Sequence, residues 1–154
     1  RVTMGTKIPP LVLLVFWMAT MWLVAWLLPG SFGFSADKYA FLTWCLFGLS
    51  GIIGVVSLIA FFKMRTTVDP LHPEKASKLV VTGIYRYSRN PMYLAILILL
   101  ICWTIRLGQP INFVFPALFI WYMNRFQIIP EERALQSKFG SHYTAYCQKV
   151  RRWV

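Results

Sequence analysis

Two long runs of apolar residues without a charge limit what this chain can fold into more than any other feature. They cover residues 9–28 and 39–62. At about 1.5 Å per residue, a helix of either length crosses a hydrocarbon layer of roughly 30 Å. The composition agrees, because 58% of the residues are hydrophobic and only 14% are charged, outside the balance of soluble domains. We therefore predict an all-α integral membrane protein.

Two shorter apolar runs follow at residues 91–105 and 110–126, and Gly108 and Pro110 stand at the turn between them. Gly and Pro in succession indicate a tight turn, so these runs are expected to form a helical hairpin. Together the four runs predict about four transmembrane helices in a single domain covering residues 1–154. No small-residue cleavage site follows the first run, which is expected to remain as a span.

Small residues in the second run predict close packing of that helix against a neighbour. Gly48, Gly51 and Gly54 are spaced by three and share one helix face, an arrangement that lets two membrane helices approach. The three cysteines are too scattered for a disulfide framework or a zinc site, so we expect them to act as small packing residues.

The distribution of Lys and Arg predicts the orientation in the membrane. Of the 16 Lys and Arg residues, 14 lie before the first run, in the polar segment 63–90, or from Arg125 onward. The positive-inside rule then places both termini and the loop 63–90 in the cytoplasm, as for a multi-pass protein of a bacterial inner membrane. With this placement, the net charge of +11 suits lipid head groups, and nucleic acid is not an expected partner.

The tail, residues 130–154, has the pattern of amphipathic helices. Pro130 suits a first helical position and Gly140 a helix end, after which Ser141 is expected to cap a second helix. We predict that this tail lies on the membrane surface. Three cations are expected to face lipid head groups and one aromatic residue to anchor the tail at the interface: Lys149, Arg151, Arg152 and Trp153.

Motifs typical of soluble enzymes are absent from the sequence. There is no GxGxxG, no GxxxxGK[ST], no HExxH and no CxxC. His72 and His142 stand seventy residues apart without an acid or Cys at ligand spacing, so no metal site is predicted.

Two clusters of polar residues on the predicted cytoplasmic face could carry chemistry. Asn90 and Pro91 start an apolar helix whose free N–H groups attract an anion, with Arg89 beside them. Glu131 and Glu132 could bind hydroxyl groups or a cation. Each cluster also has a purely structural explanation, in which Arg89 snorkels to the head groups and the two acids stabilise the positive end of a helix dipole. The same holds for Tyr93, Tyr143 and Tyr146, which could be interfacial aromatics.

Two sequence strings in a fixed order carry a family resemblance. Residues 79–93 read LVVTGIYRYSRNPMY, and after a membrane hairpin residues 131–146 read EERALQSKFGSHYTAY. This pattern resembles the membrane methyltransferases related to isoprenylcysteine carboxyl methyltransferase and phospholipid N-methyltransferase, over roughly residues 66–150. Asn90 stands where the eukaryotic enzymes usually carry His and is similar to many bacterial members.

The resemblance implies that S-adenosylmethionine is the cofactor and that a membrane lipid or an amphipathic molecule is the acceptor. We expect catalytic roles for Arg125 and Glu132. Arg125, at the end of the fourth run, could pair with the acceptor if that is a carboxylate, and otherwise it is a snorkelling anchor. The resemblance also implies that the cofactor is contacted by a set of residues from both strings: Val81, Gly83, Tyr85, Arg89, Asn90, Pro91, Tyr93, Glu131 and Glu132.

Three alternatives remain open at this point. The acceptor could be an amine, such as a phospholipid head group, or a thiol, instead of an isoprenylcysteine-type carboxylate. The chain could be a small NADPH-dependent protein similar to sterol reductases, which carry a comparable C-terminal pattern. It could also be an interaction or scaffold protein with an inactive pocket.

Overall fold

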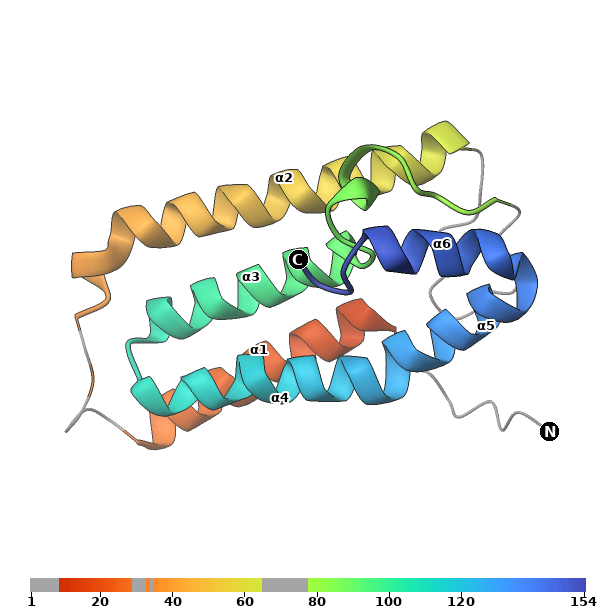
Figure 1. The fold of residues 1–154 in the computed structure, drawn as a ribbon. Coiled ribbons are helices and arrows are strands. Elements are labelled where there is room, and N and C mark those ends of the chain that lie inside the picture. Colours follow the sequence, from red (N-terminus) through yellow and green to blue (C-terminus); the bar gives the residue numbers. More distant parts are fainter. Residues whose placement is uncertain (1–8, 29–32, 34, 65–77) are drawn as a thin grey trace.

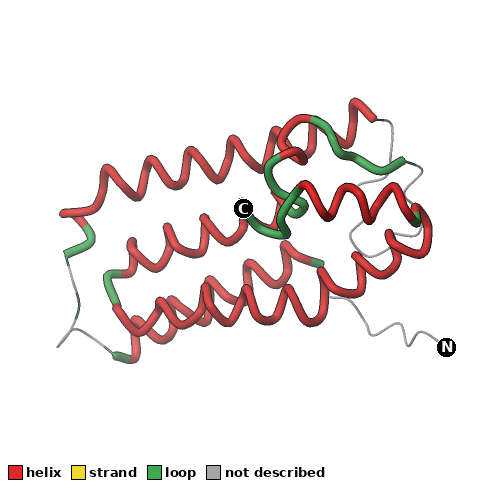
Figure 2. Tube along the Cα trace, in the orientation of Figure 1, coloured by secondary structure: helices red, strands yellow, loops and turns green. Residues whose placement is uncertain are grey.

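The computed structural model describes residues 9–28, 33, 35–64 and 78–154. Within these residues the chain forms helices and connecting loops without strands (Figure 2), so the predicted all-α class is confirmed. Residues 65–77, which contain His72 and the middle of the predicted loop 63–90, lie outside the described residues, as do residues 1–8.

The long helices lie side by side, and successive helices point in opposite directions (Figure 1). The apolar runs of the sequence become helices with nearly the predicted bounds: α1 (Pro10–Leu27), η1 (Asp37–Tyr39) leading into α2 (Ala40–Met64), α3 (Pro91–Leu107), and η4 (Pro110–Phe113) leading into α4 (Val114–Tyr122). Gly108 ends α3 with φ +68°, a left-handed conformation that favours glycine. The expected hairpin between the third and fourth runs is therefore present.

The fourth helix continues past its predicted end. A π-helical turn, η5 (Met123–Ile128), joins α4 to α5 (Ile129–Phe139) without a break. Pro130 lies in the first turn of α5, as predicted, but α5 continues the preceding helix and is not a separate tail helix. Pro130 cannot donate a backbone hydrogen bond, and a wider helical turn immediately before it is one way in which a continuous helix accommodates a proline.

The apolar side chains of α1 and α2 point mostly outward. Pro10–Leu27 and Asp37–Ala60 are long and apolar enough to cross a membrane, and α3 is a shorter apolar helix. In an 18-residue window of each segment, only 11% and 17% of the residues are buried, whereas an apolar helix in the core of a soluble protein is buried on all sides. Exposed aromatic and aliphatic surface of this kind suits contact with lipid. Two of the four predicted spans therefore meet the length criterion, and the four-span arrangement stays a prediction.

The face of α2 that packs on α3 is lined by hydroxyl groups and not by the predicted glycines. Three buried residues recur at intervals of two helical turns: Thr43, Ser50 and Ser57. Ser50 Oγ donates to the backbone oxygen of Ala95 at 2.8 Å. A Cβ atom at Gly48 or Gly51 would meet nothing within 4 Å, and at Gly54 it would lie 3.8 Å from the Cβ of Ala95. The packing prediction is thus wrong for Gly48 and Gly51 and holds for Gly54.

Buried apolar side chains form two separate clusters. The first lies among α1, α3, α4 and η5, and we refer to these helices together with α2 as the bundle. Its buried members include Leu97, Leu100, Phe119 and Met123. The second cluster is built on Tyr143, Tyr146 and Val150 with Leu79 and Val81 packed against them.

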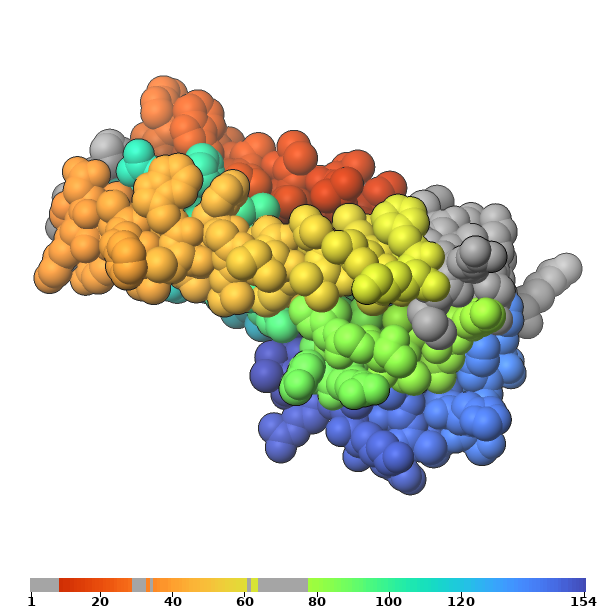
Figure 3. All heavy atoms as spheres, turned by 90° about the horizontal axis from the view of Figure 1, so that it is seen from above, coloured from red at the N-terminus to blue at the C-terminus, as the bar shows by residue number. Residues whose placement is uncertain are grey.

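The second cluster belongs to a region that we call the cap, defined as residues 78–90, α5, α6 (Ser141–Lys149) and residues 150–154. The cap gathers at one end of the bundle (Figure 3). Gly140 joins its two helices with φ +52°, a conformation that favours glycine. No side chain forms an N-capping hydrogen bond at the start of α6, so the predicted N-capping role of Ser141 is wrong.

Candidate functional site

The two predicted motifs meet where the cap joins the bundle. Tyr93, in the first turn of α3, donates its hydroxyl to Glu131 Oε1 at 2.7 Å, across 38 residues of sequence. Gln127 Nε2, one turn before Glu131, donates to the same oxygen at 2.6 Å. Tyr93 and Gln127 are both buried. The Glu131 carboxylate is therefore oriented by two buried donors and does not stand at a free helix end.

Glu132 lies between two guanidinium groups. Arg152 Nε donates to Glu132 Oε1 at 3.0 Å and Arg152 Nη2 donates to Oε2 at 2.7 Å. Arg89 Nη2 lies 3.4 Å from Glu132 Oε1. The hydrogen bonds to Glu132 raise the pKa of Arg152. Glu132 therefore accepts from one guanidinium and lies beside a second, so its charge is shared between two cations.

Arg89 is turned into the protein. Its side chain is 14% exposed, its Nη1 donates to Cys147 Sγ, and its Nε is buried without a hydrogen-bond partner. Its backbone N–H donates to the oxygen of Arg151 at 3.0 Å. A snorkelling arginine instead extends its charged group into the head-group layer. The geometry therefore contradicts the snorkelling interpretation of Arg89.

Asn90 fastens the C-terminal segment to the start of α3. It precedes that helix but makes no capping hydrogen bond with its side chain. Its Nδ2 donates to the backbone oxygen of Arg152 at 3.0 Å, and its backbone N–H donates to Ser88 Oγ at 3.1 Å. Pro91 is buried as the first residue of α3. The side chain of Asn90 thus contacts the tail and not the helix N-terminus.

Three buried tyrosines line the interior of the cap. Tyr85 lies in η3 (Gly83–Arg86), and Tyr143 and Tyr146 lie in α6. Tyr146 donates its hydroxyl to the backbone oxygen of Tyr85 at 2.6 Å, and Gly83 begins η3 with φ +63°. Burial raises the pKa of all three phenols, so they stay neutral near pH 7. Tyr146 serves as a hydrogen-bond donor, and because Tyr143 and Tyr146 are buried, the interfacial interpretation of these two residues is wrong.

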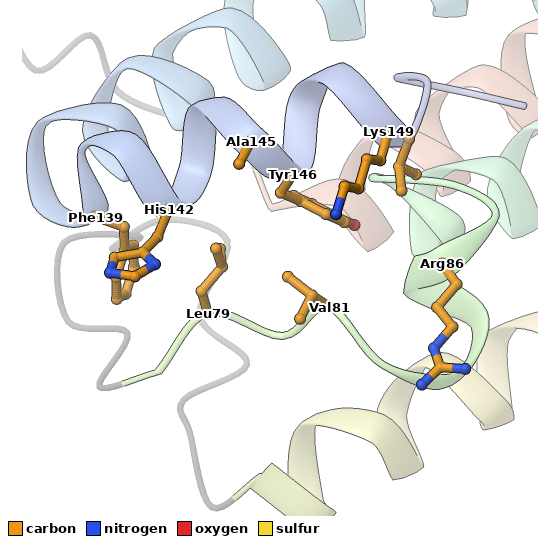
Figure 4. A pocket seen from close by; sticks show the side chains of 9 residues that line it. Leu79, Val81, Arg86, Phe139, His142, Ala145, Tyr146 and Lys149 are labelled. Carbon is orange, nitrogen blue, oxygen red and sulfur yellow. The ribbon is translucent and has the colours of Figure 1, made fainter.

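A pocket of about 650 Å³ opens between α6 and residues 79–86. Figure 4 shows Arg86 and Lys149 at one end and His142 beside Phe139 at the other. The remaining lining is largely apolar and includes Leu79, Val81, Ala145, Tyr146 and Val150. Neither Glu131 nor Glu132 lines this pocket. Tyr146 connects the two regions, because it lines the pocket and also bonds to the backbone oxygen of Tyr85, four residues before Arg89.

The C-terminal segment differs from the predicted surface helix. Helix α6 ends at Lys149, and Arg152 turns inward to Glu132, whereas Lys149 and Arg151 are exposed. Trp153 Nε1 donates to Asn124 Oδ1 at 3.1 Å, and its ring packs on the bundle core. The tail therefore closes over the junction of cap and bundle, and the predicted lipid contacts of Arg152 and Trp153 are wrong.

The structure brings most of the predicted site residues together, and it adds others. Val81 packs in the cap cluster, and Arg125 is exposed on η5. Gln127 lies one helical turn before Glu131, a spacing at which side chains of one helix interact, so the sequence contained a signal for it. No such signal existed for Arg152 or Cys147, whose contacts depend on how the tail folds back.

Comparison with known proteins supports the resemblance. The family model described as phospholipid methyltransferase matches residues 39–142, more than half of the chain. An uncharacterized protein of Haemophilus influenzae is 48% identical over 63 residues, which are 41% of this chain and all of that protein. A probable protein-S-isoprenylcysteine O-methyltransferase of Oryza sativa is 31% identical over 99 residues, covering 64% of this chain.

Protein-S-isoprenylcysteine O-methyltransferase B of Arabidopsis thaliana is 29% identical over 102 residues, or 66% of this chain. The match spans 52% of each plant protein's length, so the chain corresponds to about half of these relatives. No solved structure matches it.

Proposed function

Because this chain belongs to the phospholipid methyltransferase family, we propose that it is a single-domain membrane methyltransferase. It uses S-adenosylmethionine to methylate a lipid-like or amphipathic acceptor at the cytoplasmic face. One observation carries the proposal: the contacts of Tyr93 with Glu131 and of Arg89 with Glu132 join the two motifs into one half-buried polar cluster.

The charges of this cluster fit the amino-acid end of such a cofactor. Arg89 Nε is a buried donor without a hydrogen-bond partner, and a guanidinium with a free donor suits a carboxylate. Glu131 and Glu132 supply negative charge for an ammonium or for ribose hydroxyl groups. In the proposal the wall at the methionine end is completed by Tyr85, Asn90, Pro91 and Tyr93. Val81 and Gly83 contact the rest of the cofactor.

When bound, the cofactor supplies an electrophilic methyl group on a sulfonium. This methyl group passes to the acceptor by in-line displacement. The protein's part in this chemistry is to orient both reactants and to exclude water. The cap has suitable groups, because its buried tyrosines stay neutral and the Glu131 carboxylate is held by two donors. No residue is assigned as a general base. Arg125 and Glu132 act electrostatically, with Arg125 pairing with an acceptor carboxylate.

The favoured acceptor is an isoprenylcysteine-type carboxylate, the class named for the plant relatives. The cap pocket supports an amphipathic anion, because the cationic side chains of Arg86 and Lys149 border an otherwise largely apolar lining. A phospholipid amine or a thiol is the competing acceptor, since the matching family model is named for phospholipids.

The proposal is tested first by cofactor binding and then by the fate of the methyl group. Protein purified in nanodiscs should bind S-adenosylmethionine and its demethylated product in calorimetry, and tighter binding of NADPH would favour the reductase alternative. Methyl-labelled cofactor and lipid extracts then identify the acceptor. A methyl ester releases labelled methanol in alkali, whereas an N-methyl or S-methyl product keeps its label.

The proposed orientation places both termini and the cap in the cytoplasm of a bacterial inner membrane. Asp37 and Ser141 are both exposed and belong to opposite ends of the bundle. In a background without the native cysteines, Asp37→Cys should react with a membrane-impermeant maleimide from outside the cell, and Ser141→Cys only after the membrane is opened. Reaction of both from the same side would contradict this orientation.

A further inference from the structure

The last residues of the chain tie three parts of the candidate site together. The backbone oxygen of Arg151 accepts from the N–H of Arg89, and that of Arg152 accepts from Asn90 Nδ2, each at 3.0 Å. The Arg152 side chain then crosses to Glu132 on α5. The tail thus fixes the position of the residues before α3 relative to the first turn of α5.

Arg152 and Arg89 compete for one oxygen atom of Glu132. Arg152 Nε lies 3.0 Å from Oε1, within hydrogen-bonding range, whereas Arg89 Nη2 lies 3.4 Å from the same atom. Arg152 also bonds to the second oxygen at 2.7 Å, so the carboxylate is aligned with its two-pronged guanidinium. Arg89 is left close to Glu132 but without a tight hydrogen bond to it, and its Nε has no partner.

We propose that Arg152 is a positioning residue of the cofactor site, which holds Glu132 away from Arg89 and so keeps Arg89 available for the carboxylate of the cofactor. The inference rests on the proposed function. Without Arg152, Glu132 would form a closer pair with Arg89, because an arginine and a carboxylate at this separation gain from direct contact. The cofactor carboxylate would then have to displace Glu132.

A merely structural salt bridge makes a different prediction. Arg152 would then contribute to the stability of the tail, and its loss would affect all ligands of the cap equally. The two readings differ for decarboxylated S-adenosylmethionine, which retains the sulfonium and the adenosine but lacks the carboxylate. If Arg152 acts through Arg89, its replacement should weaken binding of the complete cofactor and leave binding of the decarboxylated analogue unchanged.

The experiment measures the dissociation constants of both ligands for the full-length protein in nanodiscs. Arg152→Gln should raise that of S-adenosylmethionine by about 10- to 100-fold, the range that corresponds to a charged hydrogen bond, and should raise the KM for this cofactor more than it lowers kcat. Arg151→Gln is the matched control, because it removes the same charge from an exposed neighbour and keeps its backbone oxygen. It should bind both ligands as the wild type does.

Arg152→Lys keeps the charge but not the two-pronged geometry. Its affinity for S-adenosylmethionine should fall less than that of Arg152→Gln. If the Gln variant does not fold, the Lys variant replaces it in the experiment. Equal weakening for both ligands, or wild-type affinity of both Arg152 variants for S-adenosylmethionine, would overturn the inference and leave the proposed function standing. A wild-type protein that binds neither ligand would overturn both.

Discussion

The bundle and the cap are held together by different forces. In the bundle, apolar side chains such as Phe119 and Leu100 are completely buried, and much of the remaining apolar surface points outward. In the cap, half-buried carboxylates and guanidinium groups and buried phenols make directional contacts beside a small apolar cluster. An apolar core accepts many combinations of side chains of the right total volume. A charged pair that loses one partner instead leaves an uncompensated charge. A mutation in the bundle should therefore lower stability alone, whereas a mutation in the cap should lower both stability and ligand affinity.

The largest effect is expected from a cavity in the bundle. Phe119→Ala removes a fully buried ring and should lower the free energy of unfolding by about 3–5 kcal/mol. Thermal unfolding in detergent measures this loss, and the folded fraction should bind S-adenosylmethionine with unchanged affinity. Phe41→Ala is the control, because this ring is 85% exposed and its loss leaves no cavity. A loss of affinity in Phe119→Ala without a loss of stability would contradict the division into two regions.

In the cap, removal of a charge should affect both stability and binding. Glu132→Gln leaves Arg89 and Arg152 facing each other, and we expect about 1.5–3 kcal/mol of lost stability. Cofactor affinity should fall by about 1–3 kcal/mol as well. Calorimetry and thermal unfolding of the same preparation measure the two quantities. Asp37→Asn, at the opposite end of the bundle, removes the same charge from an exposed position and should change neither.

Tyr93 tests the junction, because it belongs to the bundle core and also bonds to Glu131 in the cap. Tyr93→Phe keeps the ring and removes only the hydroxyl, so we expect a loss of about 1–2 kcal/mol in stability. If Glu131 contacts the cofactor, affinity should fall in parallel. A variant with normal stability and normal affinity would show that this hydrogen bond does not orient the Glu131 carboxylate.

The smallest effects are expected on the outer face of α2. Gly51→Leu extends into open space and should leave stability within about 0.5 kcal/mol of wild type. Gly54→Leu meets α3, because a Cβ there already lies 3.8 Å from Ala95, and it should cost about 1–3 kcal/mol. The reverse order of the two unfolding temperatures would mean that the glycine face, and not the hydroxyl face, packs on α3.

Much of the fold could be predicted from the sequence because it depends on local patterns. The apolar runs gave the bounds of α1, α2 and α3 to within about two residues, and Gly108 and Pro110 marked the hairpin turn. The missed continuation through Pro130 has a physical cause, since a π-helical turn depends on the neighbouring packing and has no strong sequence signature. The glycine face was misassigned because a spacing of three cannot distinguish a helix surface that packs from one that is exposed.

For the candidate site, the sequence by itself determined which residues are chemically suited to the proposed ligand. Arg89, Glu131 and Glu132 were identified by type and order, because charged residues beside apolar runs need a reason to be there. Only the tertiary structure decided their partners. Tyr93 reaches Glu131 because two helices pack side by side, and Arg152 reaches Glu132 because the tail folds back across the cap. Such contacts join residues far apart in sequence. A sequence pattern does not predict the direction in which a short tail without regular structure turns.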